Sequence, residues 1–253
     1  MKKIIFTLLS LIFTISVVFS QSFQTSDIRQ DISDITINQN KQLTATYVIT
    51  HSPNQTIIDG ISIACGSSGI TRDNSYLRIF DLVNDFGINE NITVSSVDFG
   101  INSATAASGG SQSITVNIYT LSGPLLYTNL TLIASQVTSV TDQDFTIFNV
   151  PISAFIPVGS VLVAEIFSAD AGNTFFMGCN NVGSTDASYL VAAACGISDP
   201  ITVTSIGFPD AQCVINVNAE PGSPSIPLSN WALGIGLLLI SGFIVVRFRR
   251  RLA

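Results

Sequence analysis

The feature that most constrains the fold is a series of short segments in which apolar and polar side chains alternate. In residues 113–119, Ile114, Val116 and Ile118 alternate with polar residues, which is the period of two expected of a half-buried strand. About ten to twelve such segments recur between turn residues, and helical periodicity is almost absent. The pattern predicts an all-β chain built from antiparallel strands.

The number of segments and the length of their connections favour a jelly-roll-like antiparallel β-sandwich over residues 61–219. An immunoglobulin domain would place a buried Trp between paired cysteines, and the only Trp of the chain, Trp231, lies beyond this interval. Residues 21–60 are polar and variable, with one strand-like segment at 44–50. This interval is interpreted either as a spacer or as an extra hairpin on the domain.

Four cysteines, all inside the sandwich interval, indicate two disulfides in an oxidising compartment. Three connectivities are open, and we favour Cys65–Cys195 with Cys179–Cys213. The second pair is supported because the segments that flank Cys179 and Cys213 can run antiparallel. Zinc is not expected, since there is no CxxC spacing and the only histidine, His51, is far from all four cysteines.

The first twenty residues have the composition of a secretory signal peptide. Lys2 and Lys3 form a basic start, residues 4–19 are predominantly apolar, and small residues precede Gln21. We therefore expect residues 1–20 to engage the export machinery and to be removed by signal peptidase.

The C-terminal region resembles a membrane anchor. A Pro-rich linker with a sorting motif occupies residues 220–230, and an apolar helix is predicted over 231–248, with Trp231 at the membrane interface. Residues 249–253 form a basic tail. The membrane stop consists of Arg247, Arg249, Arg250 and Arg251. By the positive-inside rule the C-terminus is cytoplasmic, the helix contacts membrane lipid, and the sandwich lies outside the membrane.

Ile226, Pro227, Leu228 and Trp231, followed by an apolar helix and an arginine cluster, resemble the IPTL-CTERM type of bacterial protein-sorting domain. The chain has no Thr between Pro227 and Leu228, where that family has one. The resemblance implies a bacterial protein, and a partner that is an exosortase-like membrane transpeptidase. Such an enzyme would cut near the motif and transfer the ectodomain to the cell surface. The alternative is an ordinary single-pass anchor that is not processed.

The exported part of the chain is strongly acidic. Outside the two targeting ends, four basic residues remain against all 17 acidic ones, a net charge of −13. Such a surface repels nucleic acid and anionic lipid, and the basic patch of nucleic-acid-binding proteins is absent from the sequence.

No catalytic residues are predicted. His51, the sole histidine, precedes Ser52-Pro53 in a polar stretch outside the core strands and is expected to be a solvated loop residue rather than a catalytic base. The sequence contains no GxSxG elbow. Glu165 interrupts an apolar strand and is expected on its outer face.

No cofactor is expected, with a structural calcium ion as the one exception considered. Calcium takes carboxylate and carbonyl oxygens from loops. The candidate ligands are Asp73, Asp81, Asp85, Asp142, Asp144 and Asp186.

The sequence thus predicts an exported bacterial cell-surface protein whose β-sandwich ectodomain is not catalytic. The ectodomain would bind an extracellular ligand or act structurally, and the C-terminal signal would hold or sort it. The alternative is a carbohydrate-active or calcium-dependent sugar-binding jelly roll.

Overall fold

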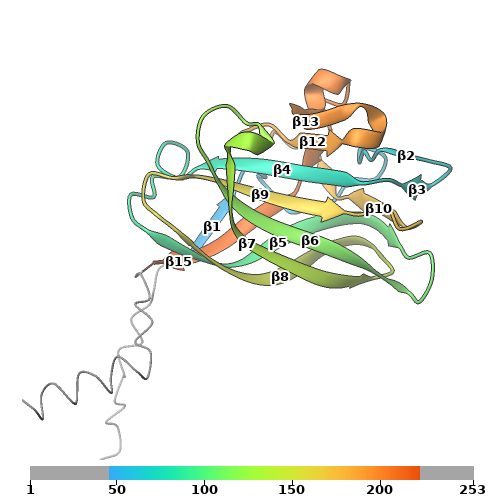
Figure 1. Cartoon of the computed structure of the whole chain (residues 1–253), viewed down its shortest axis with the longest axis horizontal. Helices are drawn as coiled ribbons and strands as arrows, with labels where there is room; N and C mark the ends of the chain where they lie inside the picture. Colours follow the sequence, from blue (N-terminus) through green and yellow to red (C-terminus); the bar gives the residue numbers. More distant parts are fainter. Residues whose placement is uncertain (1–45, 223–253) are drawn as a thin grey trace, which may run out of the picture. The chain divides into compact units, whose positions relative to one another are not determined.

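The structure is a computed structural model and describes residues 46–222. Two antiparallel sheets lie face to face in this part of the chain, with the strands of each running across the molecule (Figure 1). The prediction of an all-β antiparallel sandwich is confirmed.

The first sheet is organised around its longest strands, β5 and β8. β15 and β10 pair with one edge of β5, and β8 pairs with the other. The strands are β1 (Tyr47–Thr50), β15 (Ile215–Pro221), β5 (Ile92–Thr105), β10 (Thr174–Met177) and β8 (Gln143–Ile156).

The second sheet has six strands and two outer edges, β13 and β7. In spatial order they are β13 (Ile197–Thr202), β12 (Tyr189–Ala192), β4 (Asn74–Asp81), β9 (Val161–Ser168), β6 (Ser111–Leu121) and β7 (Leu130–Thr141). Two short ladders join β2 (Gly66–Ser67) to β3 (Ile70–Thr71) and β11 (Cys179–Asn180) to β14 (Gln212–Cys213). The 3-10 helices are η1 (Tyr127–Asn129), η2 (Ala193–Cys195) and η3 (Val203–Ile206).

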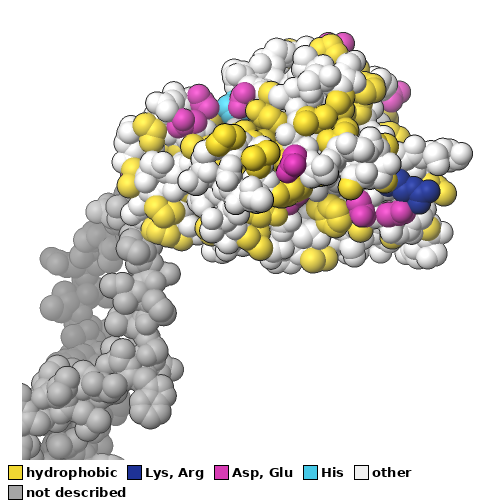
Figure 2. Space-filling view, turned by 45° about the horizontal axis from the view of Figure 1, so that its top comes forward, with side chains coloured by type: hydrophobic (Ala, Val, Ile, Leu, Met, Phe, Trp, Pro, Cys, Tyr) yellow, Lys and Arg dark blue, Asp and Glu magenta, His cyan; other side chains and the backbone are white. Residues whose placement is uncertain are grey.

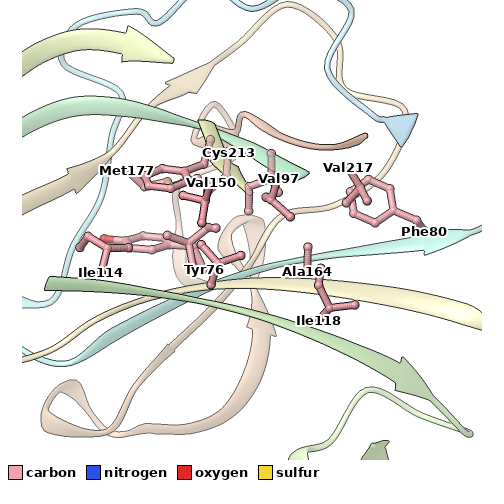
Figure 3. Close-up of a cluster of buried hydrophobic side chains, with 14 of the residues drawn as sticks. Tyr76, Phe80, Val97, Ile114, Ile118, Val150, Ala164, Met177, Cys213 and Val217 are labelled. Carbon is pink, nitrogen blue, oxygen red and sulfur yellow. The ribbon is translucent and has the colours of Figure 1, made fainter. Parts of the chain in front are cut away.

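The main core fills the space between the sheets. Side chains from both inner faces, among them Tyr76 and Ile118 from one sheet and Val97, Val150 and Val217 from the other, point into it (Figure 3). All of them are buried. Each such side chain contributes roughly 1.5–3 kcal/mol through its removal from water. The predicted inward face of residues 113–119 is confirmed, because Ile114, Val116 and Ile118 are fully buried.

Two glycines allow three segments to meet at the centre of the sandwich. A Cβ on Gly100 would lie 2.9 Å from the Gly178 carbonyl oxygen, and a Cβ on Gly178 would lie 2.6 Å from the Gly100 carbonyl carbon. The Gly178 amide donates to the Gly100 carbonyl, the Gly100 amide to Val214, and the Val214 amide back to Gly178. This closed ring of backbone bonds ties β5 to the segments that carry Cys179 and Cys213.

Alternation and turn residues in the sequence also predict strands over residues 57–64 and 202–207 and a strand end at Pro151, and these three predictions were wrong. Residues 57–64 form no strand, because Gly60 turns the chain with a φ of 77°. Residues 203–206 form η3, whose start is capped by the Thr202 side chain accepting from the Ser205 amide. Pro151 does not end its strand. β8 continues through it because β8 is an edge strand, where a missing N–H costs no ladder bond.

The sandwich extends slightly beyond the predicted limits of 61 and 219. β1 pairs with β15, so the first sheet begins inside the interval interpreted as a spacer or hairpin, and β15 runs to Pro221. The predicted signal peptide, sorting motif, membrane helix and arginine cluster lie outside the described residues. Between residues 46 and 222, no helix has both the length and the apolar character needed to cross a membrane.

One of the two predicted disulfides is present. Cys65 and Cys195 are bonded, with Cα atoms 6.0 Å apart, and join the segment before β2 to η2. Cys179 and Cys213 lie directly opposite each other in the predicted antiparallel arrangement, but both are free thiols. The Cys179 thiol donates to the Cys213 sulfur at 3.7 Å, a non-bonded contact rather than the roughly 2.05 Å of a disulfide.

Replacing both cysteines of the disulfide, Cys65→Ser with Cys195→Ser, should lower the free energy of unfolding by about 3–5 kcal/mol. The bond closes a long loop and so restricts the unfolded chain. Urea unfolding followed by circular dichroism measures the change. Reductant should bring the wild type to the midpoint of the double variant and leave the variant unaffected; an unchanged midpoint in the double variant would contradict the prediction.

Candidate functional site

An apolar concavity with a volume of about 490 Å³ lies beside the disulfide. Its size falls in the range of ligand-binding clefts, roughly 300–1,000 Å³. We call it the disulfide groove. Its lining residues are Ser62, Ile63, Ala64, Cys65, Phe176, Leu190, Cys195, Ile197, Ile206 and Phe208.

Four separate parts of the chain build the disulfide groove. The segment before β2 supplies one wall, β10 and β12 supply the floor with Phe176 and Leu190, and the segments around η2 and η3 supply the other wall. The Cys65–Cys195 bond crosses between the two walls and fixes their separation. Phe208 projects from the rim and is 49% exposed.

The disulfide groove is lined mainly by apolar side chains. Seven of its ten lining residues are aliphatic or aromatic, two are the cysteines of the disulfide, and the tenth is Ser62, so no ionisable group lines it. An exposed aromatic at the rim and partly buried apolar side chains beneath it suit an apolar or aromatic group of a ligand. The one sequence signal for this groove is the aromatic residue in the Gly-Phe-Pro-Asp turn at residues 207–210.

A second notable feature is a fully buried arginine in the main core. Arg78 lies on β4, and its guanidinium donates to the Cys213 carbonyl at 2.7 and 3.0 Å, to the Ser184 hydroxyl at 2.9 Å and to the Asp186 carbonyl at 2.6 Å. Burial lowers the pKa of Arg78. The hydrogen bond from the Cys179 thiol lowers the pKa of Cys213, and the positive charge of Arg78 adds to this effect. Since Arg78 and both thiols are buried, we assign the group a structural role.

His51 is buried, which corrects the expectation of a solvated loop residue. The residue is 3% exposed, and its ring stacks on Phe80. Nε2 must carry the proton, because it lies 2.8 Å from the Ile79 carbonyl, which can only accept; Nδ1 then accepts from the Thr185 hydroxyl at 2.7 Å. Burial lowers the pKa of His51. The neutral imidazole is therefore an element of packing.

Glu165 lies on the outer face of β9, as predicted, but it is buried. The carboxylate accepts from the Asn117 amide at 2.8 Å and from the Tyr119 and Tyr127 hydroxyls at 2.7 and 2.6 Å. The β6–β7 connection carries Tyr127 over this face and covers the carboxylate with a small second core. Burial raises the pKa of both tyrosines well above their ordinary value. These three donors satisfy the buried carboxylate through hydrogen bonds.

The six calcium candidates do not converge. No group of three or more His, Cys, Asp or Glu side chains that could hold a metal occurs in residues 46–222. Three of the candidates instead accept hydrogen bonds from backbone amides: Asp73 from Asp170, Asp81 from Asn84, and Asp142 from Ala106. Asp186 accepts from the amide of the next residue. Asp85 and Asp144 lie in the turn after β4 and at the start of β8.

The surface of the sandwich is acidic and its acids are dispersed. Residues 46–222 contain two arginines and fourteen acidic residues, and Arg78 is buried while Arg72 pairs with Asp170 at 2.9 Å. Figure 2 shows acidic side chains scattered over one face, with basic colour confined to a small patch and hydrophobic areas between them. The arrangement is unfavourable for anionic ligands.

No family model and no curated protein matches the chain. Among solved structures, two of infectious bursal disease virus are weakly similar. The VP2 subviral particle has 11% identity and a TM-score of 0.25, and the T13 viral particle has 13% identity and a TM-score of 0.24. These matches cover 72% and 71% of this chain and 38% and 36% of the viral chains. At these scores the likeness carries no argument about function.

If the disulfide groove binds apolar groups, Phe208→Asp should weaken its binding of the uncharged dye Nile red at least about tenfold, or 1.4 kcal/mol. The substitution removes the rim aromatic and places a charge at the mouth. Fluorescence titration measures the dissociation constant. Val48→Asp is the matched control, because Val48 is 61% exposed on β1 and does not line the groove. Equal losses in the two variants would show that the dye binds elsewhere.

The buried His51 predicts acid sensitivity. Its folded pKa lies below the ordinary 6.5, so its contribution to stability is fully present above pH 6.5 and is lost as the pH falls toward the folded pKa. The loss should approach about 1.4 kcal/mol per pH unit between those two values. Asp85, Asp186 and Arg78 are the charged groups that act on the ring.

Urea unfolding of wild type and His51→Gln between pH 7.5 and 5 tests this. The variant cannot take up the proton and should lose less stability on acidification. Parallel curves for the two proteins would assign the acid sensitivity to other groups.

Proposed function

We propose that the protein is an exported bacterial cell-surface protein whose β-sandwich is a non-catalytic binding domain. The disulfide groove would receive an apolar or aromatic group of an extracellular ligand. The C-terminal signal would hold the domain at the membrane or sort it onward. The observation that carries the proposal is the Cys65–Cys195 disulfide, in a domain whose flanking sequences resemble a signal peptide and a sorting signal.

The disulfide supports export because such bonds persist in oxidising compartments and are rare in the cytosol. The disulfide also bridges the walls of the groove. The groove therefore has its shape only in an oxidising compartment, where the bond can form. The signal-peptide pattern at 1–20 supports the same compartment independently, from sequence.

Within the sandwich class we propose the jelly-roll arrangement. The chain passes between the two sheets repeatedly, from β4 to β5 to β6 and again from β7 to β8 to β9 to β10. Such wrapping of antiparallel strands around two sheets is what a jelly roll requires, and it supports the finer assignment.

For the tail we propose a sorting signal in which Ile226, Pro227, Leu228 and Trp231 are recognised by an exosortase-like enzyme. The support is the resemblance of residues 226–251 to such signals, because the predicted apolar helix and the arginine cluster follow the motif directly. Signal peptidase and the export machinery are the partners proposed for residues 1–20.

The intact mass of the protein recovered from the cell envelope and from the medium tests this proposal. We expect a chain that begins near Gln21 and lacks about the last thirty residues, as removal of a signal peptide and a sorting tail requires. Deleting residues 231–251 should release the domain from the envelope. A mass that retains residues 231–253 in the membrane fraction would replace sorting with a simple anchor, and a cytoplasmic protein with an intact N-terminus would overturn export.

A further inference from the structure

The exposed edge of β7 differs from every other outer strand edge in the described residues. Natural sheets protect such edges with short strands, charges or prolines, because an unpaired edge can pair with another chain. β13 is short and contains Asp199 and Pro200, and β1 and β10 have four residues each. β8 carries Asp144 and Pro151.

β7 has none of these safeguards along most of its length. The strand has twelve residues, contains no charge and no proline, and pairs only with β6. A bulge interrupts its pairing at Ile133, which leaves residues 134–141 in regular register with β6. In that regular part Val137 is 59% exposed.

A tight turn connects β7 to β8, and the two strands contact each other. A groove of about 340 Å³ borders Ala134, Ser135 and Gln136 at the middle of the strand, between β7 and β8. Four residues beyond β7, Phe145 is 52% exposed and adopts a φ of 51°, in the left-handed region that is unfavourable for a bulky residue. The chain that leaves this edge thus reaches an exposed aromatic residue in a strained conformation within four residues.

We infer that β7 is a self-association edge, at which it pairs antiparallel with β7 of a second copy of the chain across a twofold axis at Val137. This register places Val137 opposite its own equivalent and Ser135 opposite Ser139 of the other copy. It uses only residues 134–140, the regular part of the strand. A twofold interface needs one self-complementary surface, and an uncharged antiparallel edge provides it.

This orientation keeps the charge repulsion between two copies small at the proposed contact. Two copies of a domain with two arginines and fourteen acidic residues repel each other wherever their acids meet. The acids next to β7 are Asp142 and Asp144, which follow its end. Antiparallel pairing about Val137 separates the two Asp142 residues by ten strand positions, about 34 Å. This exceeds the screening length of about 8 Å at physiological salt several-fold.

The inference does not depend on the proposed surface location, and it is tested with the full chain in detergent. Sedimentation velocity should show a dimer for the wild type. Val137→Lys should raise the dissociation constant at least about tenfold, because it places two ammonium groups opposite each other at the axis. Val48→Lys, on the exposed edge strand β1, is the matched control and should leave the dimer intact.

A second variant tests the register without weakening the contact. Val137→Cys should form a disulfide between copies under mild oxidation, with peptide mapping joining residue 137 to residue 137, whereas Val48→Cys should not. A monomeric wild type would overturn the inference. So would a dimer that survives Val137→Lys, since another face or the C-terminal tail would then hold the copies together.

Discussion

The contact between Gly100 and Gly178 is the constraint on which the centre of this sandwich depends. Their backbones lie so close that a Cβ on either residue would overlap the backbone of the other. Backbone hydrogen bonds among Gly100, Gly178 and Val214 join three segments of the chain. Because the segments meet there, Cys213 lies where its carbonyl can accept from the buried Arg78. A side chain at either glycine would therefore disturb both the strand junction and the hydrogen bonds of a buried charge, which is costly to leave unpaired.

Polar groups enter the interior of this protein as hydrogen-bonded sets. Arg78 is held by carbonyls and a hydroxyl, His51 by a carbonyl and a hydroxyl, and Glu165 by an amide and two hydroxyls. Each set links strands or loops that are distant in sequence. A satisfied network of this kind fixes one arrangement of the strands, because alternative registers would leave a buried polar group without partners.

The surface of the domain has acidic regions and two regions without charge. Dispersed acids keep copies apart over most of the domain, whereas the disulfide groove and the β7 edge are the apolar and uncharged places at which contact costs little. The groove suits a small apolar group, and the edge suits an extended backbone. The two features lie on different elements, so ligand binding and self-association can occur in one protein without competing for residues.

The sequence determined the strand class, the inward face of residues 113–119 and the face on which Glu165 lies, because alternation is a local signal. Cysteine content predicted two disulfides but left three connectivities open, and only the structure decided for Cys65–Cys195. The sequence also predicted that Cys179 and Cys213 would be adjacent, although not that they would be free thiols. Only the tertiary structure decided that His51 is buried, that Glu165 is covered by the β6–β7 connection, and that residues 62–65 and 206–208 form one groove. These features are formed by segments that are far apart in sequence. The alternation of residues within one segment does not predict which other segment it will contact.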